Sequence, residues 1–259
     1  MRSNIIVIDS RFRKNPETTV SSNFRINFNY PIWAKGYTIK QLIIPNTEYN
    51  VTEKNNAFSY FYNSNALSVV VPVGQYTITD LLGFLQASIR TATADDTIEL
   101  SQDPFTKKVV ITSPTQTFTL DNNPTPTNLL APFLGFPQNV NVSGNVLVAS
   151  LFPKITGVLN YYLMSNTLSQ GTSGFLGDGV ETPLVCEIPM DRAAFGQYGF
   201  VQENHPTLNT YMFDREVNLQ NIDIRIVNYE NEEIDLKGLP ITIVIRTHES
   251  DSSISKAHK

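Results

Sequence analysis

Side chains that commonly carry out acid–base or metal chemistry are few in this chain. Only three histidines are present. His205 precedes Pro206 in a predicted loop, His248 follows the last predicted strand, and His258 lies in the polar C-terminal stretch. A catalytic triad or a histidine-rich metal site therefore has few groups to draw on. The sequence also lacks a paired-histidine zinc helix, a paired-cysteine cluster and a nucleophile elbow. We expect ordinary loop histidines, no bound metal or cofactor, and a protein that is not an enzyme.

Carboxylates and glycines offer the remaining candidates for chemistry. The acidic cluster at residues 230–235 could bind calcium, but it lacks the spacing and central glycine of an EF-hand loop, so a solvated hairpin turn is favoured. The glycine-rich stretch 169–179 is not followed by the Gly-Lys-Ser/Thr of a phosphate loop and predicts a mobile surface loop. An enzyme would have to rely on carboxylates such as Asp191 with Glu203, whose spacing does not place them together.

One basic cluster could make a binding contact. Arg11, Arg13 and Lys14 could touch nucleic acid or the carboxylates of a neighbouring chain, and a plain solvated arm is equally open. The formal net charge of the chain is −5, which disfavours nonspecific binding to nucleic acid. Of the two contacts we therefore favour the one with protein.

Aromatic residues form a second candidate binding group. Tyr30, Trp33 and Tyr37 could stack on a sugar, or they could belong to the core or to a subunit interface. Core or interface is favoured. Tyr30 and Trp33, together with the basic cluster, are the candidate inter-subunit contacts.

The elements that position these groups are mostly predicted strands. Apolar residues occupy every second position in 24–28 and 222–226, and the isoleucines of 241–245 repeat with the same period. Period-two alternation buries one face of a strand and exposes the other, which is typical of antiparallel sheets. Together with further strand candidates, this pattern predicts an all-β sandwich.

One segment departs from the strand pattern. Residues 78–89 carry apolar side chains at helical spacing, and Thr77 with Asp80 resembles a capping box at the helix start. A hairpin over 98–111 follows, and residues 117–120 could add a third strand to it. We expect this helix and hairpin to form an excursion from the sandwich over about residues 76–137.

Composition sets the remaining limits. The 259 residues fit a single large β domain spanning 1–259, with flexible arms at 1–19 and 249–259. The single cysteine, Cys186, excludes an internal disulfide and is expected to be a buried apolar residue. No stretch approaches the roughly 18 apolar residues of a membrane span, and the apolar run at the start is too short for a signal peptide.

The order of several short motifs resembles that of the penton, or minor capsid, proteins of virophages, polinton-like viruses and large DNA viruses. The resemblance covers most of the chain, and its motifs lie at residues 8–11, 22–26, 44–50, 55–58, 74–77, 134–136, 222–225 and 234–241. It implies a single jelly-roll sandwich in which the first and last strands lie side by side, with the helix and hairpin as an insertion or a decoration.

The resemblance also implies a function. Five copies would form a ring at each fivefold vertex of an icosahedral capsid, in contact with the major capsid protein, in a virion assembled in the host cytoplasm. The expected partners are then copies of the same chain and the major capsid protein, and neither a small-molecule substrate nor nucleic acid is expected. The alternative is a β-sandwich that binds carbohydrate, or a vertex spike that recognises a host receptor.

Overall fold

The computed structural model describes residues 3–16, 19–121, 130–138, 140–155, 157, 159–170, 174–176, 180–190, 194–202 and 210–248. The chain divides into two compact units. Unit 1 is Met1–Glu48 together with Val158–Lys259, and unit 2 is Tyr49–Gly157. Unit 2 is therefore inserted into the chain of unit 1.

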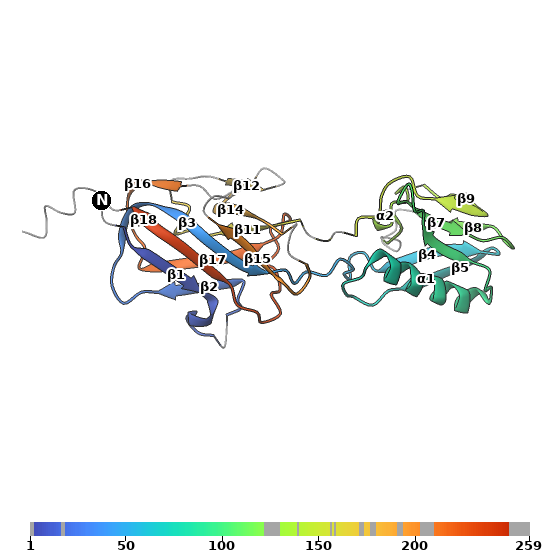
Figure 1. Cartoon of the computed structure of the whole chain (residues 1–259), viewed down its shortest axis with the longest axis horizontal. Coiled ribbons are helices and arrows are strands. Elements are labelled where there is room, and N and C mark those ends of the chain that lie inside the picture. The colour runs from blue at the N-terminus through green and yellow to red at the C-terminus, as the bar shows by residue number, and fades with distance from the viewer. Residues whose placement is uncertain are drawn as a thin grey trace, which may run out of the picture. The chain divides into compact units, whose positions relative to one another are not determined.

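Unit 1 contains two main antiparallel sheets, which we call sheet A and sheet B. In sheet A the strand order is β1 (Ile5–Asp9), β18 (Thr242–His248), β3 (Trp33–Pro45) and β15 (Tyr198–Gln202), and β16 (Thr210–Asn218) also pairs with β3. In sheet B the order is β14 (Leu184–Pro189), β11 (Asn160–Met164), β17 (Asn221–Val227) and β2 (Asn23–Asn27). Figure 1 shows the strands β1, β18 and β3 side by side.

The strand order is that of a jelly roll. If β1, β2, β3, β11, β14, β15, β17 and β18 are numbered one to eight along the chain, the sheets read 1-8-3-6 and 5-4-7-2. The chain passes from one sheet to the other at every connection except the one between β11 and β14, which pair with each other. This is the double-sheet arrangement of two Greek keys. Both the all-β sandwich and the pairing of the first strand with the last are confirmed.

Alternation explains why these segments form the sandwich. Along β18, Ile243 and Ile245 are fully buried, while the alternating residues Thr242, Val244 and Arg246 are partly exposed. Strand β2 buries Phe24 and Ile26 in the same way. The inward rows of both sheets meet in one apolar core, because period-two strands present all their apolar side chains to one face.

Two irregularities shape the edge of sheet A. Strands β15 and β16 pair with different parts of the same edge of β3, residues 41–45 and 33–38 respectively. A Cβ on Gly36 would lie 2.4 Å from the carbonyl oxygen of Tyr211, so glycine permits the close approach of β16. The β3–β16 register also shifts between Met212 and Val217.

Unit 2 is built from two small antiparallel sheets and a helix. One sheet has the order β5 (Asn65–Val70), β4 (Ala57–Tyr62), β8 (Phe118–Leu120) and β9 (Val142–Gly144), and the other β10 (Val146–Val148), β7 (Val109–Thr112) and β6 (Glu99–Gln102). Helix α1 (Ile78–Thr93) buries Leu81, Leu82, Leu85 and Ile89 in a core with these strands. Figure 1 shows α1 beside β5, and α1 also contacts β6. A further short helix is α2 (Leu130–Phe133).

The start of α1 confirms its predicted cap. The Thr77 hydroxyl accepts a hydrogen bond from the Asp80 N–H at 3.2 Å and donates one to the Asp80 carboxylate at 2.6 Å. The helix ends at Thr93, and Ala94 follows in the left-handed conformation. The predicted hairpin is present as β6 and β7, which pair antiparallel.

Several expectations need correction. The insertion, unit 2, begins at Tyr49 and ends at Gly157, and is therefore wider than the excursion expected over about residues 76–137. Strand β8 pairs with β4 and β9 instead of extending the β6–β7 hairpin. Within the stretch predicted as a mobile glycine-rich loop, β12 (Gly174–Leu176) is a strand that pairs with β13 (Val180–Thr182).

The N-terminal arm also differs from its prediction. Within residues 1–19, Ile5–Asp9 forms β1 and Ser10–Phe12 forms the short 3-10 helix η1. Asp9 and Ser10 are buried, and their hydrogen-bond partners include Thr242 of β18 and Ile241 just before it. The C-terminal arm, residues 249–259, lies outside the described residues.

Candidate functional site

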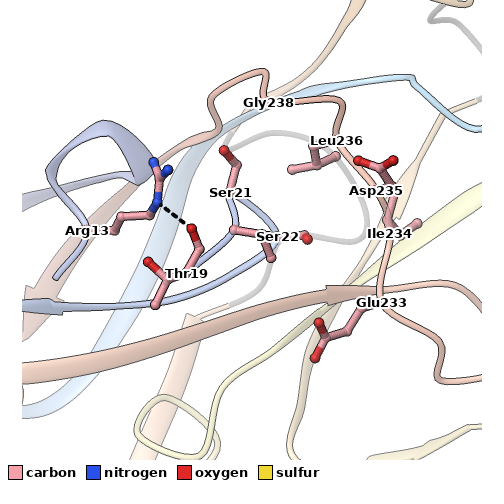
Figure 2. Close-up of a pocket in the computed structure, with 10 residues that line it drawn as sticks. Arg13, Thr19, Ser21, Ser22, Glu233, Ile234, Asp235, Leu236 and Gly238 are labelled. Atoms are coloured by element: carbon pink, nitrogen blue, oxygen red, sulfur yellow. Dashed lines mark hydrogen bonds between the residues drawn. The ribbon is translucent and has the colours of Figure 1, made fainter. Parts of the chain in front are cut away.

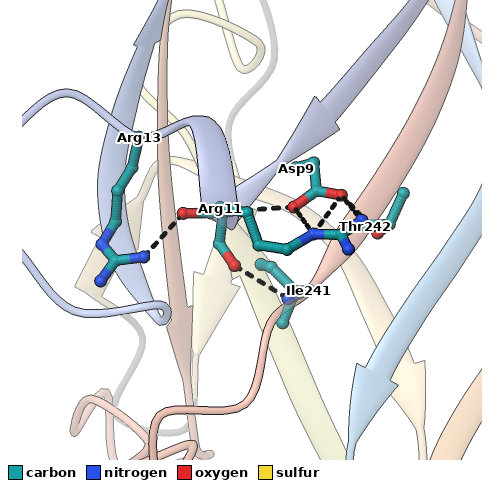
Figure 3. A network of polar contacts seen from close by, with 6 residues as sticks. Asp9, Arg11, Arg13, Ile241 and Thr242 are labelled. Carbon is teal, nitrogen blue, oxygen red and sulfur yellow. Dashed lines mark hydrogen bonds and ion pairs between the residues drawn. The ribbon is translucent and has the colours of Figure 1, made fainter. Parts of the chain in front are cut away.

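The three residues of the basic cluster do not form one cationic patch. Arg11 pairs with the Asp9 carboxylate, and Arg13 donates hydrogen bonds to the carbonyl oxygens of Ser10, Pro16 and Thr19 at 2.8, 3.3 and 3.1 Å. Lys14 has an exposed side chain, and its backbone N–H donates to the Arg25 carbonyl. Figure 3 shows Arg11 and Arg13 extending in different directions from η1.

Asp9 and Ser10 fasten the end of β1 to β18. Asp9 accepts hydrogen bonds from the backbone N–H and guanidinium of Arg11 and from the Thr242 hydroxyl (Figure 3). Ser10 exchanges two hydrogen bonds with Ile241, at 3.1 and 3.0 Å. The hydrogen bonds from Arg11 hold the pKa of the Asp9 carboxyl below its usual value, against the opposing effect of burial. Arg11 therefore stabilises the end of β1 through Asp9, although its side chain is exposed.

The aromatic group also divides. Tyr37 is fully buried, stacks on Tyr211, and donates its hydroxyl proton to the Leu168 carbonyl at 3.0 Å. Its pKa is raised because burial disfavours the phenolate. Tyr30 and Trp33 are 80% and 52% exposed, so Tyr37 belongs to the core and the other two remain available at the surface.

The remaining candidates for chemistry are structural where the structure describes them. Cys186 is buried in β14, as expected, and His248 shares a hydrogen bond of 2.8 Å with the Thr38 hydroxyl. The Asn228 side chain accepts hydrogen bonds from two backbone N–H groups of the acidic turn, those of Glu230 and Glu232. Asp191, Glu203, His205 and His258 lie outside the described residues.

The described residues contain neither a candidate metal cluster nor a candidate membrane-spanning helix. No group of three or more His, Cys, Asp or Glu side chains in that part of the chain could hold a metal ion. None of the helices described there has the length and apolar character needed to cross a membrane.

The side of sheet A that faces away from the core carries exposed apolar side chains, and we call it the outer face. Val7 pairs with Val244, and Ile43 pairs with both Thr242 and Phe200, so these side chains share one side of the sheet. Its apolar members are Ile5, Val7, Ile43, Tyr198, Phe200 and Val244. Val7 and Phe200 are 54% and 53% exposed.

Arg11 lies at the end of this outer face. Asp9 pairs with Thr242 in the row that also contains Ile43 and Phe200. The hydrogen bonds and charge of Asp9 raise the pKa of Arg11, and Tyr198 of the same face contributes in the same direction. The outer face therefore combines apolar side chains with a cation at one end. Arg11 could be identified from the sequence but its apolar neighbours could not, because residues 5–8 are all apolar and show no alternation that would separate an outer face from a buried one.

A pocket of about 320 Å³ lies beside η1 in unit 1, and we call it the serine pocket. It is lined on one side by Arg13 and Thr19–Ser22 and on the other by Glu233–Leu236 and Gly238 (Figure 2). Ser21 and Ser22 are only 6% and 2% exposed. Sequence reasoning identified the 230–235 turn and Arg13 but could not place them at one site, because more than 200 positions separate them in the chain.

Comparison with known proteins gives one short match. A 53-residue segment is 32% identical to part of an uncharacterized protein of Acanthamoeba polyphaga mimivirus. The match takes in 20% of this chain and only 8% of the mimivirus protein. No protein-family model matches the chain. The similarity suggests a viral origin.

Proposed function

We propose that this protein is a structural capsid protein that forms homopentameric pentons at the fivefold vertices of an icosahedral shell. The observation that carries the proposal is the strand order of unit 1, two interlocked Greek keys that pair the first strand with the last. Jelly rolls of this kind build many viral shells, although a fold alone does not establish a function. The match to a mimivirus protein supports the viral setting.

The outer face supports the assembly part of the proposal. Exposed apolar side chains lie on the same face at both edges of sheet A, Val7 on β1 and Phe200 on β15, each paired with an apolar residue of the neighbouring strand. Exposed apolar side chains gathered on one face of a folded protein are typical of an interaction site. A heterologous contact repeated with rotation closes a ring, and closure at five copies would fit a capsid vertex.

The test is the mass of the purified protein in solution and its place in the particle. Five chains of 29.0 kDa give about 145 kDa, which light scattering distinguishes from a monomer or a trimer. We expect a species of that mass, alone or with the major capsid protein, and density for the jelly roll at the vertices of virions by cryo-electron microscopy. A chain that stays monomeric with the major capsid protein and is absent from particles would refute the proposal.

The exposed aromatic residues favour a second function, recognition of carbohydrate or of a host receptor. Tyr30 and Trp33 lie three positions apart with exposed rings, the kind of surface on which sugars stack. A glycan array tests this function, with Trp33→Ala as the matched variant. Binding that Trp33→Ala abolishes would support it, and the absence of binding to any glycan would remove carbohydrate as the ligand.

A further inference from the structure

The serine pocket contains polar groups that are buried but not satisfied within the protein. Neither the Ser21 nor the Ser22 hydroxyl makes a hydrogen bond to any described residue. The only fully enclosed side-chain polar atoms without a partner in the described part of the chain are the Tyr60 hydroxyl and Arg225 Nε. The two serine oxygens therefore open into the pocket, and Figure 2 shows them between Arg13 and residues 234–236. Buried polar groups normally have partners, so this pair suggests a ligand.

Charged groups of both signs border the same pocket. The Glu233 carboxylate accepts a hydrogen bond from the Asn23 amide at 2.5 Å, and none of the described lysines or arginines pairs with it. Arg13 uses three of the five N–H donors of a guanidinium on backbone carbonyls, which leaves two for an incoming acceptor. Asp235, in contrast, already pairs with Lys237 at 2.6 Å.

The walls of the pocket add an apolar component. Val20, which is 54% exposed, supplies the accessible apolar surface at the rim, whereas Ile234 and Leu236 belong to the core and offer almost none. A volume of about 320 Å³ suits a short stretch of extended chain rather than a folded domain. A matching ligand would therefore carry an apolar side chain and, close to it, a cation that can pair with Glu233. It would also offer main-chain carbonyls to Arg13 and hydroxyl or N–H groups to the two serines.

The tail, residues 249–259, has this pattern in its sequence. In an extended chain, residues two positions apart lie on one side, so Ile254 and Lys256 would share a side with Ser252. Ile254 is the only large apolar residue in the tail, and Lys256 supplies the cation. We propose that the serine pocket binds the tail of a second copy of this chain, with Ile254 against Val20 and Lys256 near Glu233.

The position of β18 favours a second copy over the same one. The pocket lies near the start of β18, since Ser10 bonds to both Arg13 and Ile241, whereas the tail follows the other end, after His248. Seven residues of strand span roughly 20 Å. The six residues from 249 to 254 reach at most about 20 Å when fully extended. Ile254 of the same copy could therefore reach the pocket only if the whole segment ran straight back along β18. This exchange goes beyond the proposed penton, because it would join copies in an assembly of any size.

Disulfide trapping in the full-length protein tests the contact. The single native cysteine is buried, so introduced thiols dominate the reaction. Val20→Cys on one copy is mixed with Ile254→Cys on another under mild oxidation, and dimers are counted on non-reducing gels. We expect dimers from this mixture, and few when Val20→Cys is replaced by Val148→Cys, an equally accessible site in unit 2.

A charge exchange makes the test specific. Glu233→Lys in the Val20→Cys copy should slow trapping about tenfold, and Lys256→Glu in the Ile254→Cys copy should restore it. Glu230→Lys, on the same turn but outside the pocket lining, should have little effect. No dimers from the mixture, or trapping only within one chain that carries both cysteines, would overturn the proposal. The mass measured by light scattering reports separately on the penton, so either proposal can fail alone.

Discussion

Asp9 and Arg11 form an ion pair in which the carboxylate is buried and the guanidinium is exposed. Arg11 Nε donates to both carboxylate oxygens, at 2.9 and 3.1 Å, and its terminal nitrogen lies 2.5 Å from Oδ2. The Asp9 side chain is 4% exposed, against 67% for Arg11. Since Asp9 also accepts a hydrogen bond from the Thr242 hydroxyl, the pair connects η1 to β18.

This pair should make stability depend on pH in the acid range. Arg11 lowers the pKa of Asp9 in the folded state, so the pair stabilises the fold above the unfolded pKa of about 4 and is lost as pH falls through the lower folded value. We expect Asp9→Asn to reduce the free energy of unfolding by about 1 kcal/mol at neutral pH. Urea titrations of both proteins should show this difference shrinking as pH falls from about 4 through the lower folded pKa of Asp9. A difference that does not change with pH would contradict the role of the charge.

Substitution on the outer face should separate association from folding. Val7→Lys places a charge among exposed apolar side chains of sheet A and should shift the assembled species towards 29.0 kDa in light scattering, with an unchanged thermal transition. Val148→Lys is the control, because Val148 has nearly the same exposure, 53% against 54%, but lies on β10. Equal loss of assembly in both variants would argue against the outer face as the contact.

The two units have separate apolar cores, so core damage should stay local. Leu85→Ala in α1 removes a fully buried side chain and should cost about 3 kcal/mol. Hydrogen exchange should then rise in α1, β4 and β7, whose residues share that core, and stay unchanged in β3 and β18. Leu42→Ala in β3 should give the opposite pattern. Faster exchange in both units from either variant would show that they unfold together.

The single thiol should be inert until the protein unfolds. Burial raises the pKa of Cys186 to about 12, with a smaller contribution from Glu187. A disulfide reagent at about pH 8 should therefore react with the native protein about a thousandfold more slowly than with the protein in denaturant. The exposed thiol of a Val20→Cys variant provides the reference rate. Rapid labelling of native Cys186 would mean that β14 opens readily.

Local patterns were sufficient for the elements that determine their own structure. Alternation located β2, β17 and β18, and helical spacing with the Thr77–Asp80 cap located α1, because burial of one face and capping depend on residues close in sequence. Strand β16 was not predicted, since Thr210–Asn218 lacks regular alternation and pairs with β3 only because Gly36 permits the approach. Strand β5 lies at a sheet edge with Val70 exposed, a position that its β-branched residues by themselves do not indicate.

The amino-acid sequence by itself determined the all-β class, the position of the helix and the scarcity of catalytic side chains. Only the tertiary structure decided which side chains meet: Arg13 with the 233–236 turn, Arg11 with Asp9, and β1 with β18. The physical reason is that apolar periodicity records which face of a strand is buried but not which distant strand lies beside it. The division at Tyr49 and Gly157 likewise depends on two cores closing separately, and no composition change in the chain marks where one ends and the other begins.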